Sequence, residues 1–364
     1  MAQLVARFHG MEEATGSNPV SSTHEAALTR EISPKVRAVF GSLKHDRTRA
    51  YRQDVSMIGW GIIGVGDVTE VKSAPAIFRA DDSDVVHVMR RDAERARDFA
   101  ERHRVARWST DAQAVIDDPA VTAVYVATPT ATHAQYAIAA ARAGKHVLVE
   151  KPMAMSAAEA GRIVEAAEAA GVRLWVAYYR RTLPRFVKIR QLLEAGVIGR
   201  PLSVHTIWRK PTDFTGWRWD PERNRGGEFY ETACHTLDVL DLLLGPATDV
   251  AGVATHDRHA VSASYRFSDV MGSGSWALGT PDALDETVLA GTEGTLSFAS
   301  FAPTPIRLVT ADAATAYEVA DPEHVHGPLV ATILDELRGV GTCPSTGQSA
   351  LRTSRLMDSI LGGS

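Results

Sequence analysis

From residue 57 onward, short apolar segments alternate with longer segments of helix-forming residues. The apolar segments are too short and too rich in β-branched residues to be helices, so they predict strands at 58–64, 85–89, 121–127, 146–149 and 173–177. The Ala-rich segments between them predict helices over 94–103, 131–143 and 157–170. This alternation is typical of a doubly wound α/β domain with a parallel sheet.

The pattern changes after Tyr178. We expect helices at 184–194, 228–243, 328–338 and 349–361 and a strand at 201–208. Further segments alternate with turn residues, which predicts mostly antiparallel strands at 250–255, 261–267, 272–277, 285–289, 294–298 and 306–309. The sequence therefore predicts an N-terminal Rossmann domain over 57–178, followed over 179–364 by an α+β domain with a large open mixed or antiparallel sheet.

The first 56 residues differ from the rest in having neither a continuous apolar segment nor a clear periodicity. Ser, Thr, Pro and Gly are frequent in this stretch, as in poorly ordered extensions. We expect residues 1–56 to be a disordered extension outside the fold and Met57 to be the natural start. Without an apolar targeting or spanning segment, we expect a cytoplasmic protein with no membrane partner.

Charge and cysteine content narrow the class of ligand. The formal net charge of −5 provides no general basic field, so we expect a small-molecule substrate and no nucleic acid. The two cysteines, Cys234 and Cys343, lie far apart and lack zinc-site spacing. We therefore expect a reducing compartment and no metal centre.

Two glycines follow the first predicted strand, in the segment Gly64-Val65-Gly66-Asp67-Val68. A G-x-G turn of this kind brings the backbone close to a pyrophosphate, and the helix after it offers free N–H groups to the anion. The third glycine position of the fingerprint holds Thr69, and glycine pairs also occur in ordinary turns. Its position between a predicted strand and a predicted helix favours a dinucleotide site.

Two arginines stand at the end of the second predicted strand, where NAD-binding proteins carry a carboxylate. Arg90 and Arg91 can hold a ribose 2′-phosphate bidentately, whereas an acidic residue would repel it. We therefore expect NADP(H) as the cofactor, with NAD(H) as the alternative. A second interpretation is that the arginines are a solvated pair and that Asp92 is the N-cap of the next helix.

More specific motifs follow the later strands. Ala127-Thr128-Pro129 is followed by His133, and Glu150-Lys151-Pro152 follows the strand at 146–149. Gly226-Gly227 leads into Cys234-His235. Together these motifs resemble the family of glucose-fructose oxidoreductase, inositol dehydrogenase and rhizopine-catabolism proteins (Gfo/Idh/MocA). The resemblance covers both predicted domains and is weakest in the C-terminal sheet.

The resemblance implies that Thr128, Pro129 and His133 lie near the cofactor and that Glu150 lies beside the nicotinamide ribose. It also implies redox chemistry on sugars, cyclitols or their keto forms, and a homodimer or homotetramer formed through the open sheet. Lys151 follows a strand at the carboxyl edge of the sheet, where open α/β proteins bind ligands. The resemblance implies that its ammonium orients the substrate oxygen. The alternative is an ordinary ion pair of Glu150 with Lys151.

A histidine in the predicted helix 228–243 is the second candidate for proton transfer, which alcohol oxidation requires alongside hydride transfer. Glu231, His235 and Asp238 are spaced i, i+4 and i+7, so they share one helical face. We expect one carboxylate to orient the imidazole and raise its basicity. The family motif has Asp where this chain has Glu231. The alternative is a core histidine capped by a neighbour.

Substrate contacts are also expected at the domain junction and in the loop after the strand at 201–208. Tyr179 and Arg180 begin the second domain and are expected to face the junction, and Tyr178 stands where many relatives have Asn. Trp217 can stack on a sugar ring and Arg218 can hydrogen-bond to it. Both can equally belong to a lid or an interface.

Three functions fit these observations. The first is an NADP-dependent dehydrogenase or ketoreductase for a sugar-like polyol, with Lys151 and His235 handling the proton. The second is a glycoside hydrolase or lyase that recycles a tightly held dinucleotide. The third is a non-catalytic sensor of dinucleotide or sugar, which has no need of either proton-handling residue.

Overall fold

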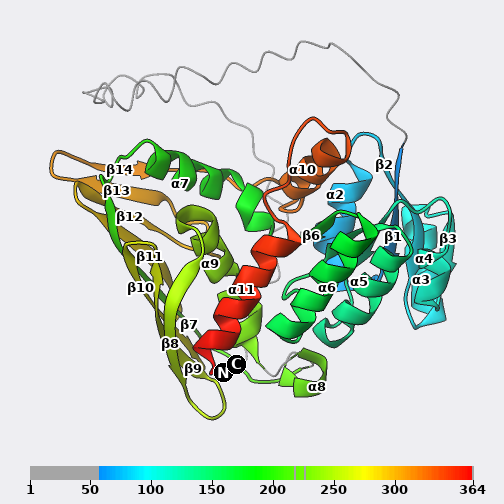
Figure 1. The fold of residues 1–364 in the computed structure, drawn as a ribbon, viewed down its shortest axis with the longest axis horizontal. Coiled ribbons are helices and arrows are strands. Elements are labelled where there is room, and N and C mark those ends of the chain that lie inside the picture. The colour runs from blue at the N-terminus through cyan, green and yellow to red at the C-terminus, as the bar shows by residue number, and fades with distance from the viewer. Residues whose placement is uncertain (1–56, 217–218, 225–226, 363–364) are drawn as a thin grey trace, which may run out of the picture. The chain divides into compact units, whose positions relative to one another are not determined.

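The computed structural model describes residues 57–216, 219–224 and 227–362, and their strands form one sheet of six strands and one of eight (Figure 1). The predicted extension 1–56 and the candidates Trp217 and Arg218 lie outside the described residues. Among the residues that are described, no helix is both long and apolar enough to cross a membrane.

The first sheet has the strand order β3-β2-β1-β4-β5-β6, and each neighbouring pair is parallel. This is the order of the doubly wound dinucleotide-binding fold, so the predicted Rossmann architecture is confirmed. The strands are β1 (Ile58–Ile63), β2 (Ser83–Met89), β3 (Arg107–Ser109), β4 (Ala123–Val126), β5 (His146–Val149) and β6 (Leu174–Val176).

Helices cover this sheet and reverse the chain between its strands. They are a π-helical turn η2 (Thr69–Ser73) continued by α2 (Ala74–Phe78), then α3 (Ala93–His103), α4 (Ala112–Ile116), a 3₁₀ turn η3 (Thr130–Thr132) continued by α5 (His133–Arg142), and α6 (Ala157–Ala170). The sequence analysis missed β3 and α4. Both are short, and β3 is an edge strand with two exposed residues, so neither produces a readable apolar periodicity.

The second sheet has the order β14-β13-β12-β11-β7-β10-β9-β8. Its pairs are antiparallel except β7 with β10, which run parallel, so the predicted mixed sheet is confirmed. The strands are β7 (Pro201–Lys210), β8 (Ala247–Ala254), β9 (Ala260–Phe267), β10 (Val270–Leu278), β11 (Leu284–Gly291), β12 (Gly294–Phe298), β13 (Ile306–Thr310) and β14 (Ala314–Tyr317). The sequence analysis missed β14, whose side chains are almost all exposed.

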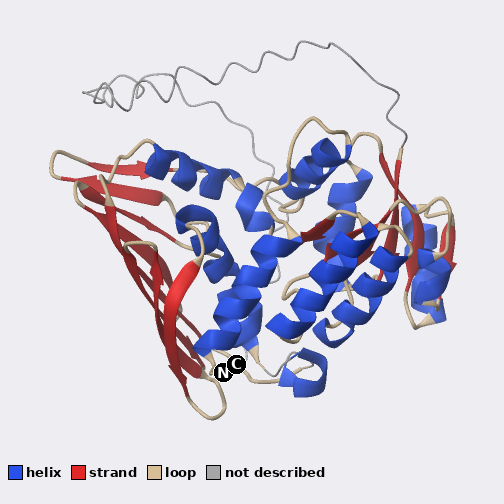
Figure 2. Ribbon diagram, viewed as in Figure 1, coloured by secondary structure: helices blue, strands red, loops and turns tan. Residues whose placement is uncertain are grey.

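Helices pack on one face of the second sheet, and no described helix packs on the other (Figure 2). The covering helices are α7 (Pro184–Glu194), α9 (Glu228–Leu244) and α11 (Gly347–Ile360). Along β7, Val204 and Trp208 are buried while Ile207 is exposed, which is the alternation of a sheet covered on one side. Ile207, Met271 and Val309 leave the open face partly apolar.

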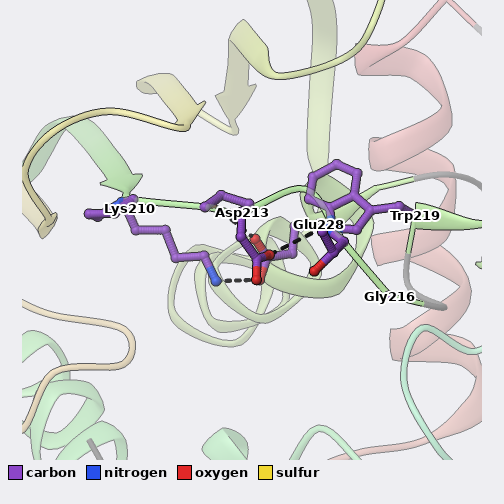
Figure 3. Close-up of a pocket in the computed structure, with 8 residues that line it drawn as sticks. Lys210, Asp213, Gly216, Trp219 and Glu228 are labelled. Atoms are coloured by element: carbon purple, nitrogen blue, oxygen red, sulfur yellow. Dashed lines mark hydrogen bonds and ion pairs between the residues drawn. The ribbon is translucent and has the colours of Figure 1, made fainter. Parts of the chain in front are cut away.

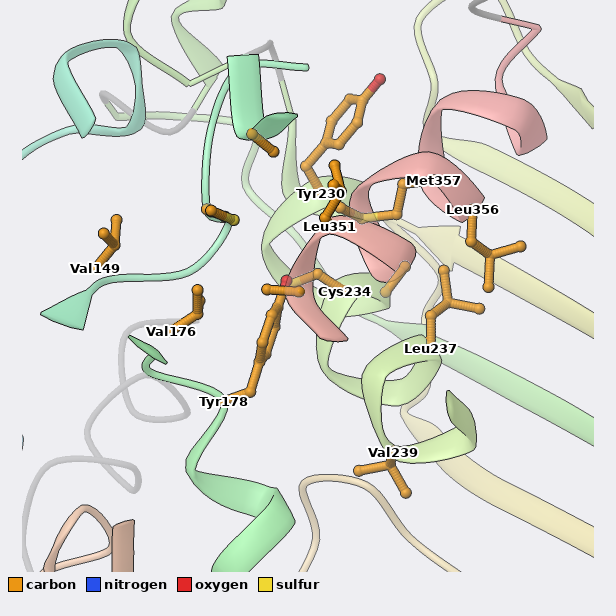
Figure 4. Packing of buried hydrophobic residues seen from close by; sticks show 14 of the residues in the cluster. Val149, Val176, Tyr178, Tyr230, Cys234, Leu237, Val239, Leu351, Leu356 and Met357 are labelled. Carbon is orange, nitrogen blue, oxygen red and sulfur yellow. The ribbon is translucent and has the colours of Figure 1, made fainter. Parts of the chain in front are cut away.

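The C-terminal helices connect the two sheets. Residues of α11 contact α6 beside the first sheet and α9 beside the second, and α10 (Gly327–Leu337) contacts α2. Figure 4 shows the resulting core, in which Tyr178 and Cys234 lie among apolar side chains of both parts. This core holds the carboxyl edge of the first sheet against helix α9.

A buried ion network reinforces this junction. Arg181, in the 3₁₀ turn η4 (Tyr179–Thr182), donates to Asp238 at 2.8–2.9 Å and to Asp241 at 2.7 Å. Arg352 of α11 donates to both carboxylate oxygens of Asp241, at 2.7 and 2.8 Å. Arg181 is 4% exposed and Asp238 is fully buried, so each carboxylate depends on its arginine for solvation.

We predict that Arg181→Met lowers the free energy of unfolding by about 3–5 kcal/mol, because it leaves the fully buried Asp238 without its cation, although Asp241 keeps Arg352. Arg352→Met is the matched control: its side chain is 41% exposed, and Asp241 keeps Arg181, so the loss should be about 1 kcal/mol or less. Urea denaturation followed by circular dichroism measures both. Equal losses for the two variants would contradict the proposed importance of the buried network.

Candidate active site

The predicted glycine turn lies at the carboxyl edge of the first sheet, after β1. Gly64 has φ +105°, and a Cβ on it would lie 2.7 Å from the carbonyl oxygen of Ala127, so only glycine fits against the end of β4. A Cβ on Gly66 would meet nothing within 4 Å. The backbone there faces open space that a ligand can approach, and Val68 begins the helical turn that follows.

A hollow of about 400 Å³ adjoins this turn, and it brings together three of the predicted cofactor residues: Gly66, Asp67 and Arg90. Arg90 also donates to the carbonyl oxygen of Val65 at 2.8 Å, which ties the end of β2 to the glycine turn. Arg91 is exposed and does not line the hollow. An open glycine backbone beside a guanidinium is a cradle that fits a dinucleotide phosphate.

The hollow also contains groups that the sequence analysis missed. Its other lining residues are Glu70, Arg95, Asp98, Phe99 and Arg102. Arg102 is already paired with Glu70 at 2.6 Å and with Asp98 at 2.9 Å. Asp92 caps α3 by accepting from the Arg95 amide at 3.1 Å, so the N-cap considered for it is confirmed. The N-cap role of Asp92 is compatible with cofactor binding by Arg90 and Arg91.

Thr128, Pro129 and His133 lie together after β4. The two ring nitrogens of buried His133 face the carbonyl oxygens of Thr128, at 2.7 Å, and of Pro152, at 3.0 Å. Burial is the main reason that the pKa of His133 is lowered. A neutral imidazole has one N–H, so His133 donates to one of these carbonyl oxygens and only contacts the other; it thereby links the loops after β4 and β5.

The ammonium of Lys151 forms an ion pair with Glu231 of α9, with 2.7 Å between Nζ and Oε2. Both side chains are largely buried, at 16% and 12% exposure. Burial alone would lower the pKa of Lys151, but Glu231, Cys234 and Glu150 outweigh it and raise that pKa. Lys151 is therefore a permanent cation at the sheet edge, and its partner is Glu231 rather than the neighbouring Glu150.

Glu150 is buried behind this pair. Its Oε1 accepts the Tyr125 hydroxyl at 2.5 Å, and its Oε2 accepts the Lys151 backbone N–H at 3.1 Å. Burial would raise the pKa of Glu150, yet contacts with His326, Lys151 and Tyr125 outweigh it and lower it to about 2. The carboxylate is therefore ionised inside the protein. The sequence analysis missed Tyr125, which donates to Glu150, and His326, whose Nε2 lies 3.6 Å from it.

The expectation that a carboxylate of α9 orients His235 and raises its basicity is wrong. Glu231 turns to Lys151, and Asp238 turns to Arg181. Nδ1 of His235 is buried and has no hydrogen-bond partner among the described residues. Burial, followed by Arg180 and Lys151, lowers the pKa of His235 well below its ordinary value. His235 is therefore a neutral imidazole one turn along α9 from the Lys151 partner.

Aromatic rings surround His235. Ring centroids of Tyr179, Phe301 and Tyr178 lie 5.7, 5.6 and 6.1 Å from that of His235. The Arg180 guanidinium stacks over Tyr179 and Phe301, at 4.9 and 4.4 Å, and its Nε donates to the Ser300 carbonyl at 2.7 Å. Tyr179 and Arg180 thus face the junction as expected, with Nη1 of Arg180 buried and without a partner among the described atoms.

A second hollow, of about 590 Å³, lies beside the start of α9 (Figure 3). Lys210 at the end of β7 and Glu228 of α9 form an ion pair on its wall, and Trp219 and Asp213 also line it. Glu228 and Glu231 are three residues apart, so they are neighbours on the helix surface. The ion pair on the wall of this hollow therefore lies about one turn along α9 from the carboxylate that binds Lys151. Sequence analysis had placed substrate contacts in this loop but on other residues, Trp217 and Arg218.

Comparisons with known proteins identify the family and agree with the fold. The sequence model described as "Oxidoreductase family, NAD-binding Rossmann fold" matches residues 58–178, and the "GFO/IDH/MocA C-terminal domain" matches residues 186–297. The chain is 36% identical over 320 residues to Oxidoreductase P35 of Formosa agariphila, a match that spans 84% of this chain and 99% of that protein.

Two further relatives are more distant or match over a shorter length. The 1,5-anhydro-D-fructose reductase of Ensifer adhaerens is 35% identical over 53% of this chain and 59% of its own. The structure of a levoglucosan dehydrogenase with NADH and levoglucosan has the same fold, with a TM-score of 0.75 at 22% identity over 84% of this chain and 96% of that chain. Given these matches over both sheets, the chain belongs to the GFO/IDH/MocA family of oxidoreductases, as the sequence motifs indicated.

Proposed function

We propose that this protein is an NADP(H)-preferring oxidoreductase that interconverts a secondary alcohol and a ketone on a sugar, cyclitol or related polyol. The observation that carries the proposal is the Lys151–Glu231 ion pair at the carboxyl edge of the nucleotide-binding sheet, with His235 one turn along α9. A bound nicotinamide supplies one chemical property, the capacity to accept or give a hydride. The residues of the chain must bind and orient the cofactor and the substrate, and they must move the proton.

Lys151 and His235 divide the proton chemistry between them. Lys151 keeps its proton because of Glu231, so it serves as a fixed donor to the substrate oxygen and stabilises negative charge on it. His235 is neutral because of burial and the nearby cations, so it can take the hydroxyl proton during oxidation and return it during reduction. Glu231 holds Lys151 through this ion pair and is proposed to contact the substrate as well.

The cofactor residues proposed are Gly64, Val65, Gly66, Asp67, Val68, Arg90, Arg91, Thr128, Pro129, His133, Glu150 and Lys151. The preference for NADP(H) rests on Arg90, whose guanidinium lines the hollow beside the glycine turn. A guanidinium there favours a ribose 2′-phosphate through charge-assisted hydrogen bonds.

A sugar-like substrate is supported by the polar hollow beside α9 and by the names of similar proteins, a 1,5-anhydro-D-fructose reductase and a levoglucosan dehydrogenase. Tyr179, Arg180, Trp217 and Arg218 are proposed to contact it. We also propose that the enzyme is cytoplasmic and a homodimer or homotetramer. The partly apolar open face of the second sheet, at Ile207, Met271 and Val309, supports self-association.

We predict that Lys151→Met lowers kcat by about 100-fold or more, because the substrate oxygen loses its charged donor. Dinucleotide affinity should fall less than kcat, because the glycine turn and Arg90 are unchanged. Steady-state assays that follow reduced nicotinamide with a panel of aldoses, inositols and keto sugars measure kcat. Lys188→Met on α7, whose ammonium lies over the Tyr317 ring, is the control. Bond cleavage without net nicotinamide turnover would favour a recycling lyase instead.

We expect the acid limb of kcat/KM for alcohol oxidation to lie below pH 6.5, the ordinary pKa of histidine. The sign follows from the lowered pKa: the base must be neutral to accept a proton, and His235 stays neutral to lower pH than a solvated imidazole does. A pH–rate profile on the free enzyme measures this limb. A limb centred at or above pH 6.5 would exclude His235, in its described environment, as the base.

Changing Arg90→Ala should reduce the ratio of kcat/KM for NADP⁺ to that for NAD⁺ about tenfold, since one charge-assisted contact to the 2′-phosphate is lost. Arg91→Ala is the matched comparison, because Arg91 is exposed and does not line the hollow, and it should change the ratio less. An unchanged ratio in Arg90→Ala would remove the argument for NADP(H).

A further inference from the structure

One buried histidine near the candidate active site has no role in the chemistry described so far. His326 is the residue immediately before α10, makes no side-chain capping hydrogen bond and is 2% exposed. Its Nε2 lies 3.6 Å from Oε1 of Glu150, and its ring centroid lies 4.7 Å from that of Tyr179. Among the described residues, neither ring nitrogen has a hydrogen-bond partner.

Buried polar groups are almost always hydrogen-bonded, because an unpaired one costs about 1–3 kcal/mol. The separation of 3.6 Å between His326 and Glu150 is slightly longer than a hydrogen bond, and a sub-ångström movement of the ring closes it. Glu150 is also buried and ionised, so it gains from any additional donor. A hydrogen bond between them would therefore satisfy a buried donor and a buried acceptor at once.

The other groups around the Glu150 carboxylate are already engaged, so His326 is the donor that is available to it. Lys151 directs its ammonium to Glu231, although its backbone N–H reaches Glu150. The Tyr125 hydroxyl from β4 already donates to Glu150. Tyr179 from η4 presents its ring to His326, and His235 from α9 lies on the same ring.

We propose that His326 is a positioning residue for dinucleotide binding, which donates its Nε2–H to Glu150 and fixes the carboxylate at the end of β5. The proposal rests on the function proposed above, in which Glu150 contacts the cofactor. It gives the C-terminal segment a part in the nucleotide site: α10 contacts both α2, which follows the glycine turn, and η4. The site is then assembled from segments more than 150 residues apart in the sequence.

The test is direct titration of the full chain with NADPH, followed by quenching of tryptophan fluorescence, so that binding is read without turnover. His326→Ala should raise the Kd about tenfold. His326→Gln places its amide N–H near the position of Nε2 and should restore most of the affinity, whereas His326→Asn reaches only the Nδ1 position and should not. Thermal unfolding of each variant checks that it folds.

His324→Gln is the matched control. His324 lies two residues earlier, and its contacts are Arg79 and Glu323, both largely exposed. This variant should bind NADPH like the unmodified chain. A coupling test completes the design: Glu150→Gln should cost less affinity in the His326→Ala background than in the unmodified chain.

The outcomes are separable. If the unmodified chain binds neither NADPH nor NADH, the proposed function fails. If it binds and folded His326→Ala binds equally well, only the role of His326 is wrong. The proposed role of His326 would also be overturned if the Glu150 and His326 changes had additive effects on NADPH affinity, or if His326→Gln and His326→Asn bound NADPH equally well. If His326→Ala does not fold, the difference in NADPH affinity between His326→Gln and His326→Asn still tests the role of His326.

Discussion

The candidate active site depends on one ion pair between the two parts of the chain, the ammonium of Lys151 at the end of β5 and the carboxylate of Glu231 on α9, 2.7 Å apart. Each group is largely buried and would be costly without the other. The pair brings α9 to the carboxyl edge of the parallel sheet, where this fold binds ligands. It also keeps Lys151 charged, because Glu231 helps to raise its pKa.

The buried charges near this pair are balanced. Glu231 is matched by Lys151, and Asp238 and Asp241 are matched by Arg181 and Arg352. The carboxylates of α9 are thereby committed to cations, and His235 is left among aromatic rings as a neutral imidazole. In the function proposed above, this neutral imidazole is the base and the Lys151 ammonium is the fixed cation. The chemistry of the site follows from which groups are paired.

Much of this arrangement could be predicted from the sequence, because period and motif are local properties. The strand–helix alternation predicted the Rossmann sheet, and Glu150-Lys151-Pro152 predicted Lys151 at its edge. The choice of ion-pair partner is not a local property. The spacing of Glu231, His235 and Asp238 suggested a contact between a carboxylate and the imidazole. Instead, Glu231 pairs with Lys151, 80 positions away in sequence, and Asp238 pairs with Arg181, 57 positions away. His326 could not be placed beside Glu150 for the same reason, and β14 and β3 are too exposed or short to show a pattern.

The most direct test of this account is a crystal structure of the full chain with NADP⁺ and a polyol that it turns over. We predict that the nicotinamide lies at the carboxyl edge of the first sheet and that the reacting hydroxyl oxygen lies within about 2.6–3.2 Å of both Lys151 Nζ and a ring nitrogen of His235. A nicotinamide bound elsewhere, or a hydroxyl that reaches neither group, would contradict the account.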